Sequence, residues 1–157
     1  MSAMLNNIEI RHEYKPGDLG TIIQMHGQLY DFGREFEIYV GKTLSEYFQH
    51  QDASKERFWI AELGGWTVGS ICLKQTDDWA QLRYFLLDPR VRGVGLGTRM
   101  MDLFLDFMKE CGYQKSFLLT EKRLQPAAKL YEKVGYQYVS SSIMDFGLEE
   151  RRYELTL

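Results

Sequence analysis

The amino-acid sequence predicts an α/β fold with a mixed central sheet of about seven strands flanked by about four helices. Three observations lead to this prediction. Short apolar runs typical of strands are interleaved with longer stretches whose apolar residues recur at helical spacing. Clusters of glycine, proline and aspartate separate these runs. Past mid-chain, a glycine-rich turn at residues 90–97 joins a strand-like run to a helix-like one.

The first third of the chain predicts one strand and two helices. Residues 8–14 alternate, with Ile8 and Ile10 on one face, and indicate a first strand. Asp18 is a natural N-cap for the next stretch, in which apolar residues recur at helical spacing. A second helix is expected at about residues 35–50, with its aromatic and aliphatic residues on one face.

Three strands are expected next. Residues 58–62 and 67–73 are strand-like and meet across Gly64 and Gly65, which is a strong hairpin signal. A polar turn then leads to a strand at residues 80–87. The near-continuous apolar end of that strand indicates burial on both faces of the sheet.

The rest of the chain continues the alternation of helices and strands. The expected elements are a helix at 98–111, a strand at 116–119, a helix at 126–135, and strands at 137–145 and 151–157. The predicted order is therefore β-α-α-β-β-β-α-β-α-β-β. Because no repeat, linker or low-complexity segment divides the chain, residues 1–157 are expected to form a single domain.

The composition is that of a globular protein, with 45% hydrophobic and 14% aromatic residues. The net charge of −3, with acids and bases intermixed, argues against nucleic acid as a main partner. The two cysteines, Cys72 and Cys111, are expected to be reduced thiols. The N-terminal residues lack the basic and apolar parts of a signal peptide, and no run approaches the roughly 18 apolar residues of a membrane span. The expected location is the cytoplasm, without a membrane partner.

The glycine-rich turn carries the strongest functional signal. Glycines let backbone N–H groups turn toward a ligand without hindrance from a Cβ atom. A helix start adds unpaired N–H donors and the positive end of the helix dipole. Arg90 and Arg92 add full positive charges. The turn therefore predicts a site for a phosphate or a pyrophosphate.

The spacing of the turn excludes two common phosphate motifs. A P-loop needs the pattern G-x-x-x-x-G-K-S/T, and no Gly-Lys followed by Ser or Thr occurs in this turn. A dinucleotide fingerprint beginning at Gly93 would need glycine where Thr98 stands. The remaining pattern, Arg92-x-x-Gly95-x-Gly97, resembles the pyrophosphate signature R/Q-x-x-G-x-G/A of the GNAT superfamily of N-acetyltransferases, which holds coenzyme A.

Other segments extend this resemblance over nearly the whole chain. Residues 126–136 resemble the family's A-x-x-L-Y-x-x-x-G-F/Y helix, whose tyrosine, here Tyr131, lies near the coenzyme sulfur. Segments at 17–20, 26–30 and 35–37 and the tail at 146–155 resemble one subgroup. In that subgroup the acetyltransferase is often fused behind a winged-helix regulator of the multiple-antibiotic-resistance type. Only the acetyltransferase half is matched here, standing alone, so DNA binding is not carried over.

The resemblance implies acetyl-CoA as co-substrate and a GNAT-like mixed sheet. The strand before the turn would splay from its neighbour and pair its free edge with the pantetheine arm, and the turn amides would hold the pyrophosphate. The residues implied in coenzyme A binding are Leu86, Leu87, Arg92, Gly93, Val94, Gly95, Leu96, Gly97, Thr98 and Tyr131.

Tyr131 is the predicted catalytic acid. A tyrosine titrates near 10 and a thiol near 8.5, so a tyrosine is protonated at neutral pH and can donate to the departing sulfur. The alternative is a core aromatic, because Ala127, Leu130 and Val134 share its apolar face.

The sequence gives weaker signals for the general base and the acceptor pocket than for the coenzyme A site. The strand before the turn carries no carboxylate, so Glu121 is the candidate base or substrate contact, with a surface carboxylate as the alternative. Arg83 keeps its proton and suits a carboxylate on the acceptor, or else a salt bridge on the sheet face. His26 and Tyr30 lie one helical turn apart and could line the acceptor pocket. The three histidines lack metal-ligand spacing, so no metal is expected.

The leading hypothesis is an acetyl-CoA-dependent N-acetyltransferase that acts on a primary amine of a small molecule, amino acid or peptide. Direct attack would take place in a ternary complex. One alternative is a non-catalytic acyl-CoA-binding module that regulates a partner protein, and another is a protein that binds ATP or GTP at the turn. The final strands would leave an edge with which a second copy could pair, so a homodimer is one expected arrangement.

Overall fold

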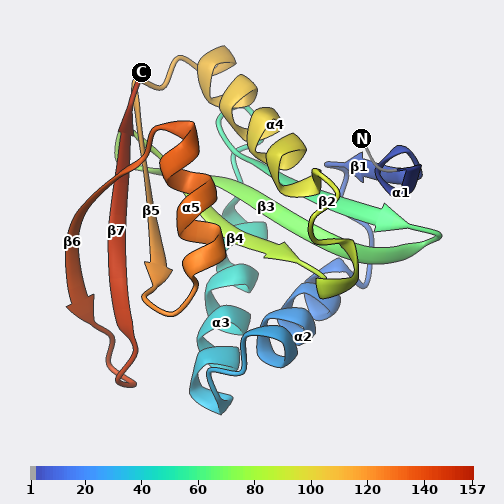
Figure 1. The fold of residues 1–157 in the computed structure, drawn as a ribbon, viewed down its shortest axis with the longest axis horizontal. Helices are drawn as coiled ribbons and strands as arrows, with labels where there is room; N and C mark the ends of the chain where they lie inside the picture. Colours follow the sequence, from blue (N-terminus) through green and yellow to red (C-terminus); the bar gives the residue numbers. More distant parts are fainter. Residues whose placement is uncertain (1–2) are drawn as a thin grey trace.

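The computed structural model describes residues 3–157 and places helices on both faces of a mixed sheet (Figure 1). Within that range the elements are α1 (Ala3–Asn6), β1 (Ile8–Arg11), α2 (Asp18–Tyr30), α3 (Arg34–His50), β2 (Arg57–Leu63), β3 (Trp66–Thr76), β4 (Trp79–Leu87), a 3-10 helix (Pro89–Val91), α4 (Leu96–Glu110), β5 (Lys115–Glu121), α5 (Gln125–Val134), β6 (Gln137–Ile143) and β7 (Glu149–Thr156). The predicted α/β fold and order of elements are confirmed, with α1 and the 3-10 helix in addition.

The sheet has the strand order β1-β2-β3-β4-β5-β7-β6. In Figure 1, β1 lies at one edge and β6, in red, at the other. The pairing of β4 with β5 is parallel, and the other pairings of the described strands are antiparallel. The sheet is therefore mixed, and its parallel pair lies at the middle.

Each face of the sheet packs against its own helices. Successive strand residues point to opposite faces, so β2 contributes Trp59 to the cluster with α4 and α5 and Phe58 to the cluster with α2 and α3. Met100 and Phe104 of α4 fill the first cluster, and Leu44 of α3 fills the second. Because the strand is covered on both faces, its sequence is a continuous apolar run.

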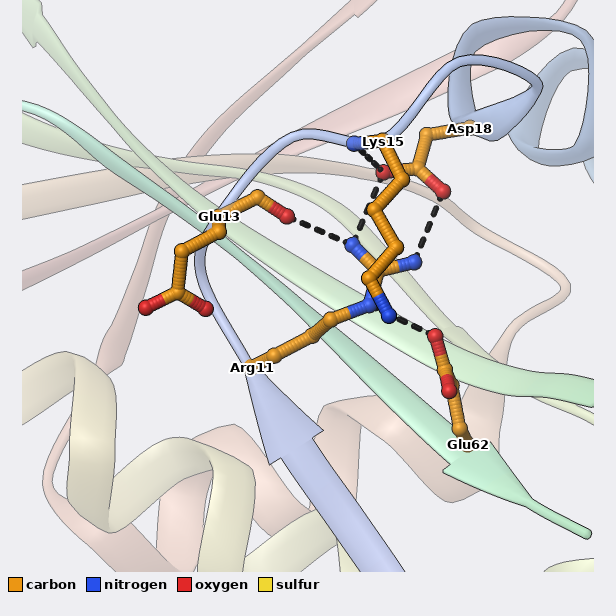
Figure 2. Close-up of polar contacts among 5 residues, drawn as sticks. All are labelled: Arg11, Glu13, Lys15, Asp18 and Glu62. Atoms are coloured by element: carbon orange, nitrogen blue, oxygen red, sulfur yellow. Dashed lines mark hydrogen bonds and ion pairs between the residues drawn. The ribbon is translucent and has the colours of Figure 1, made fainter. Parts of the chain in front are cut away.

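A charged cluster fixes the start of α2 against the sheet (Figure 2). The Arg11 guanidinium of β1 donates to Glu62 of β2 at 2.6 Å and, through both Nη atoms, to the Asp18 carboxylate at 2.8 Å. The Lys15 backbone N–H also donates to Asp18, at 2.8 Å. The sequence prediction that Asp18 caps α2 is wrong: Gly17 is the N-cap, and the carboxylate is taken up by Arg11 and Lys15 instead.

Replacing Arg11 by alanine is expected to lower the free energy of unfolding by about 3 kcal/mol at pH 7, because the Asp18 carboxylate would remain buried without its positively charged partner. Burial raises the pKa of Asp18, but the hydrogen bonds from Arg11 and Lys15 outweigh it and leave the pKa below the ordinary 3.8. The pair therefore stabilises the fold fully above that value, and the stabilisation is lost as the pH falls through the lowered pKa. Urea unfolding at pH 7 and pH 3 should show a smaller difference between wild type and variant at pH 3. Equal differences would contradict this assignment.

Candidate active site

An opening in the sheet lies between β4 and β5. These parallel strands pair only from Ala80 with Ser116 to Leu82 with Leu118. Both strands continue beyond that point, β4 to Leu87 and β5 to Glu121, with no further pairing between them. The carboxyl half of β4 therefore has a free backbone edge, as the sequence analysis expected.

A bulge in β4 accompanies this separation. The register of β3 with β4 shifts between Ser70 and Cys72, and Tyr84 has a φ of 51°. A non-glycine residue rarely adopts this left-handed conformation. The Ser70 hydroxyl donates to the Tyr84 carbonyl at 2.6 Å and holds the bulged residue. Because a bulge bends its strand, it directs the end of β4 away from β5.

Alternate residues along the free edge of β4 direct their main-chain groups into the opening. The Phe85 carbonyl accepts a hydrogen bond from the Tyr30 hydroxyl, and the Leu87 carbonyl accepts one from the Arg92 guanidinium at 3.2 Å. Leu86 instead pairs with β3. In a strand, the N–H and C=O of one residue point the same way. The main-chain N–H and C=O groups of Phe85 and Leu87 therefore point into the opening. Leu86 lies beside the opening, but its N–H points toward β3.

The start of α4 presents unpaired backbone N–H groups beside an arginine. Gly93 and Gly95 have φ values of 76° and 94°, and Gly95 is the N-cap of the helix. In the described part of the chain, the backbone N–H groups of residues 93–98 have no acceptor. Arg90 forms an ion pair with Asp88 at 2.8 Å, so Arg92 is the arginine of the turn left without a carboxylate partner within residues 3–157. Unpaired amides, the helix dipole and this arginine fit a diphosphate.

Gly97 allows α4 to approach the free edge closely. A Cβ atom at this position would lie 3.2 Å from Cδ1 of Leu87 and 3.3 Å from Cδ2 of Leu130. The absent side chain therefore lets α4 pack against both β4 and α5.

Two adjoining hollows occupy the opening. The first, here called the turn-side cleft, has a volume of about 370 Å³ and is bordered by Leu86, Leu87, Arg92 and Gly93. The second, here called the inner cavity, has a volume of about 140 Å³ and lies between α2, α3, β4, β5, α5 and β7. Both are lined by Tyr30, Phe85, Leu124 and Ala127. One molecule in each hollow would therefore meet its neighbour at Tyr30 and Phe85.

Tyr131 lines the inner cavity beside this junction. Its ring centroid lies 6.1 Å from that of Phe85, and the residue is only 4% exposed. Within residues 3–157 its hydroxyl makes no hydrogen bond to another residue. Burial raises the pKa of Tyr131 well above the ordinary 10.0, so the hydroxyl carries its proton at neutral pH. The ring also packs against Tyr136 and Tyr153, so Tyr131 is part of the core as well as of the cavity wall.

The residues predicted for the acceptor pocket all line the inner cavity: His26, Tyr30, Arg83 and Glu121. His26 Nδ1 donates to the Ile22 carbonyl at 2.8 Å, and burial lowers the pKa of His26 to about 4. His26 is therefore neutral at pH 7, and its Nε2 carries no proton.

Arg83 and Glu121 differ in whether a charged side chain already binds them. Arg83 donates to the Tyr39 hydroxyl at 3.3 Å, and no ion pair involves it in the described residues, which disfavours the sheet-face salt bridge. Glu121 accepts hydrogen bonds from the backbone N–H and from Nε of Arg123, the latter at 3.0 Å. The carboxylate predicted as base therefore already holds the turn between β5 and α5.

The sequence analysis missed several residues of the inner cavity. Glu150 of β7 lies opposite Glu121 in the sheet register and lines the cavity, and burial raises its pKa above the ordinary 4.5. Phe32 and Phe36, at the junction of α2 and α3, form an aromatic wall with ring centroids 5.1 Å apart. The sequence signals Glu150 only through the run Glu149-Glu150-Arg151-Arg152 in β7. The position of Glu150 beside β5 depends on the strand order, which the sequence does not show.

Residues 3–157 contain neither a candidate metal-ligand cluster nor a candidate membrane-spanning helix. No group of three or more histidine, cysteine, aspartate or glutamate residues in this range could hold a metal ion. In the same range, no helix is both long and apolar enough to cross a membrane.

Comparison with known proteins gives a consistent result. The profile of the Acetyltransferase (GNAT) family matches residues 26–136. Mouse N-acetyltransferase 8 is 32% identical over 94 residues, which are 56% of this chain and 41% of that protein. An acetyltransferase from Streptococcus agalactiae 2603 is similar with a TM-score of 0.77 at 24% identity, covering 96% of this chain and 99% of that chain. For a GNAT family acetyltransferase from Elizabethkingia anophelis with acetyl-CoA bound, the TM-score is 0.71 at 14% identity, covering 97% and 99%.

Proposed function

The chain belongs to the acetyltransferase (GNAT) family, and from this premise we propose that it is an N-acetyltransferase. In this proposal it moves the acetyl group of acetyl-CoA to a primary amine of a small molecule, an amino acid or a peptide. The observation that carries the proposal is the pair of adjoining hollows. The turn-side cleft is bordered by the free edge of β4 and by Gly93, the first residue of the turn with a free amide, and the inner cavity places a protonated tyrosine beside the junction.

Each part of the site supports one step. Acetyl-CoA supplies an acetyl group activated as a thioester. The N–H groups of residues 93–98 and Arg92 hold the diphosphate by charge-assisted hydrogen bonds. The main-chain N–H groups of Phe85 and Leu87 orient the thioester at the junction. Tyr131 donates a hydrogen bond to the departing sulfur, and direct attack needs no enzyme-bound acetyl group because donor and acceptor occupy adjoining hollows.

Thermal unfolding tests the donor class. Coenzyme A at about 100 times its dissociation constant is expected to stabilise the protein by about 2.7 kcal/mol. For a domain of this size that corresponds to a rise in Tm of about 5–10 °C. ATP at the same concentration is expected to give a much smaller rise, because the site adds a strand edge for the pantetheine arm to the phosphate contacts. A larger rise with ATP would favour a nucleotide-binding protein.

One observation favours a second candidate, a non-catalytic acyl-CoA-binding module that regulates a partner. The carboxylate expected to serve as base, Glu121, is engaged by Arg123. A screen of primary amines with acetyl-CoA, read out as thiol release, separates the two functions. Coenzyme A binding without thiol release for every amine would support the module.

A further inference from the structure

The Glu150 carboxylate, at the inner cavity, has no hydrogen-bond or ion-pair partner among the described residues. Glu150 lies directly opposite Glu121 in the register of β7 with β5, and both side chains line the cavity. In the part of the chain that the structure describes, no hydrogen bond or ion pair engages the Glu150 side chain. The nearby acids are engaged: Glu121 by Arg123 at 3.0 Å, Glu149 by Lys122 at 3.4 Å, and Glu154 by Arg152 at 2.7 Å.

The surroundings of Glu150 favour a cationic ligand. Glu150 is half-buried, and burial raises its pKa, against an opposing effect of the Arg83 charge. The other titratable groups that line the cavity are His26 and Tyr30 of α2, Tyr39 of α3, Arg83 and Tyr84 of β4, Glu121 of β5, and Tyr131 of α5. None of these forms an ion pair with Glu150 in residues 3–157, because Arg83 acts on it only from beyond ion-pair distance, so an ammonium group would supply a counter-charge in direct contact.

The cavity also offers the positive charge of Arg83, which forms no ion pair within residues 3–157. The Arg83 guanidinium donates to the Tyr39 hydroxyl at 3.3 Å and lies 4.7 Å from the ring centroid of Tyr84. Neither contact is to an anion, and among the described residues Arg83 forms no ion pair, since the Glu150 carboxylate feels its charge only from beyond ion-pair distance. A guanidinium presents several N–H donors in a planar fork that matches a carboxylate. The inner cavity thus combines one available anion with one available cation.

Apolar side chains form most of the remaining wall. Phe32, Phe36 and Tyr30 stack or pack edge to face, with ring centroids 5.1–6.3 Å apart. Leu119, which is 40% exposed, and Leu148 add aliphatic surface. This wall suits an apolar substituent between the two charges.

We propose that the acceptor is a free amino acid with an apolar side chain, with Glu150 binding and deprotonating its ammonium group and Arg83 binding its carboxylate. This inference rests on the proposed function, because it names the acceptor of that reaction.

Two protons leave the acceptor nitrogen during the reaction. One proton passes from the ammonium to the Glu150 carboxylate and then to water. The freed nitrogen lone pair forms a C–N bond to the acetyl carbon, and the C–S bond breaks. The second proton of the attacked nitrogen ends on the sulfur, relayed by the Tyr131 hydroxyl. The products are one N-acetyl amino acid, one thiol and one proton.

Kinetics with L-phenylalanine test the role of Glu150. Glu150→Gln is expected to lower kcat/KM by about 10²-fold, with the dissociation constant of acetyl-CoA unchanged. In the wild type kcat/KM should rise with pH as Glu150 ionises, and the variant should lack this acidic limb. Glu154→Gln is the matched control, because Glu154 points to the same face of β7 but is bound to Arg152. An acidic limb that persists in Glu150→Gln would overturn the assignment.

A pair of acceptors tests Arg83. Phenylethylamine differs from phenylalanine only by the missing carboxylate. Arg83→Gln is expected to raise KM for phenylalanine at least about tenfold and to leave KM for phenylethylamine unchanged. Equal use of both amines by the wild type would overturn the acceptor class.

A binding measurement separates this inference from the proposed function. If the wild type binds acetyl-CoA but acetylates no amine, the proposed function fails. Calorimetric titration with L-phenylalanine in the presence of coenzyme A then still tests the cavity. Binding that is lost in both variants supports the amino-acid site, and absence of binding to the wild type overturns it.

Discussion

Replacing Tyr131 by phenylalanine is expected to lower turnover by about 10²–10⁴-fold and to leave the affinity for acetyl-CoA unchanged. The side chain lines the inner cavity at its junction with the turn-side cleft, and its hydroxyl has no hydrogen-bond partner in residues 3–157. Since burial raises its pKa well above 10.0, the hydroxyl stays protonated at neutral pH. It is therefore available to donate to the departing thiolate, and steady-state kinetics with a responsive amine would measure the loss.

Stability distinguishes this role from that of a core aromatic. The Tyr131 hydroxyl makes no hydrogen bond to a residue in 3–157, so phenylalanine removes none there and keeps the ring contacts with Phe85, Tyr136 and Tyr153. The free energy of unfolding of Tyr131→Phe should therefore equal that of the wild type or exceed it by up to about 1 kcal/mol. Lost turnover together with unchanged or higher stability would identify a residue retained for catalysis.

Tyr153→Phe is the matched control. Tyr153 is also buried, and its ring centroid lies 6.3 Å from that of Tyr131, but it lines neither hollow. This variant should keep the turnover of the wild type. Full turnover in Tyr131→Phe, or equal losses in both variants, would contradict a role for the Tyr131 hydroxyl at the sulfur.

Local patterns made the order of elements predictable. The hairpin between β2 and β3 follows from Gly64 and Gly65, which have φ values of 58° and 82°. The start of α4 follows from Gly95, since the N-cap conformation at φ 94° strongly favours glycine. Residues close in sequence determine both the hairpin and the start of α4, so both can be predicted from the local sequence.

The opening between β4 and β5 was less predictable from the chain. The apolar end of β4 suggested burial on both faces, but Phe85 and Leu87 are only partly buried because they border the hollows. The bulge places Tyr84 at a positive φ, which no sequence signal for tyrosine indicates. The position of the free edge could be inferred only from the resemblance to a family.

The sequence analysis missed Glu150, whose carboxylate faces the inner cavity, because its position depends on the tertiary structure. Glu150 lies beside Glu121 because β7, rather than β6, pairs with β5. The sequence does not reveal that Arg123 engages Glu121, since that hydrogen bond depends on the turn after β5. The choice of Glu150 as the proposed base therefore depends on both the strand order and the hydrogen-bond partners.

Replacing Gly93 by valine is expected to weaken coenzyme A binding by about 10²-fold or more. Gly93 borders the turn-side cleft with a φ of 76°, and its N–H is one of the unpaired amides of the turn. A β-branched residue is strained at this φ and would rotate the neighbouring amides away from the ligand. Two lost charge-assisted hydrogen bonds, at about 1.5–3 kcal/mol each, correspond to a loss of at least about 10²-fold in affinity.

The strain itself must be separated from the loss of binding, and Gly112 provides the means. It follows the C-cap of α4 with a φ of 82°, and a Cβ atom at either Gly93 or Gly112 would meet nothing within 4 Å. Each valine variant should therefore lose about 1–2 kcal/mol of stability from the same backbone strain. Calorimetry should find normal coenzyme A affinity in Gly112→Val and the large loss in Gly93→Val alone. Equal affinities in the two variants would mean that the amides at the start of α4 do not hold the diphosphate, and the site would have to be sought elsewhere in the opening of the sheet.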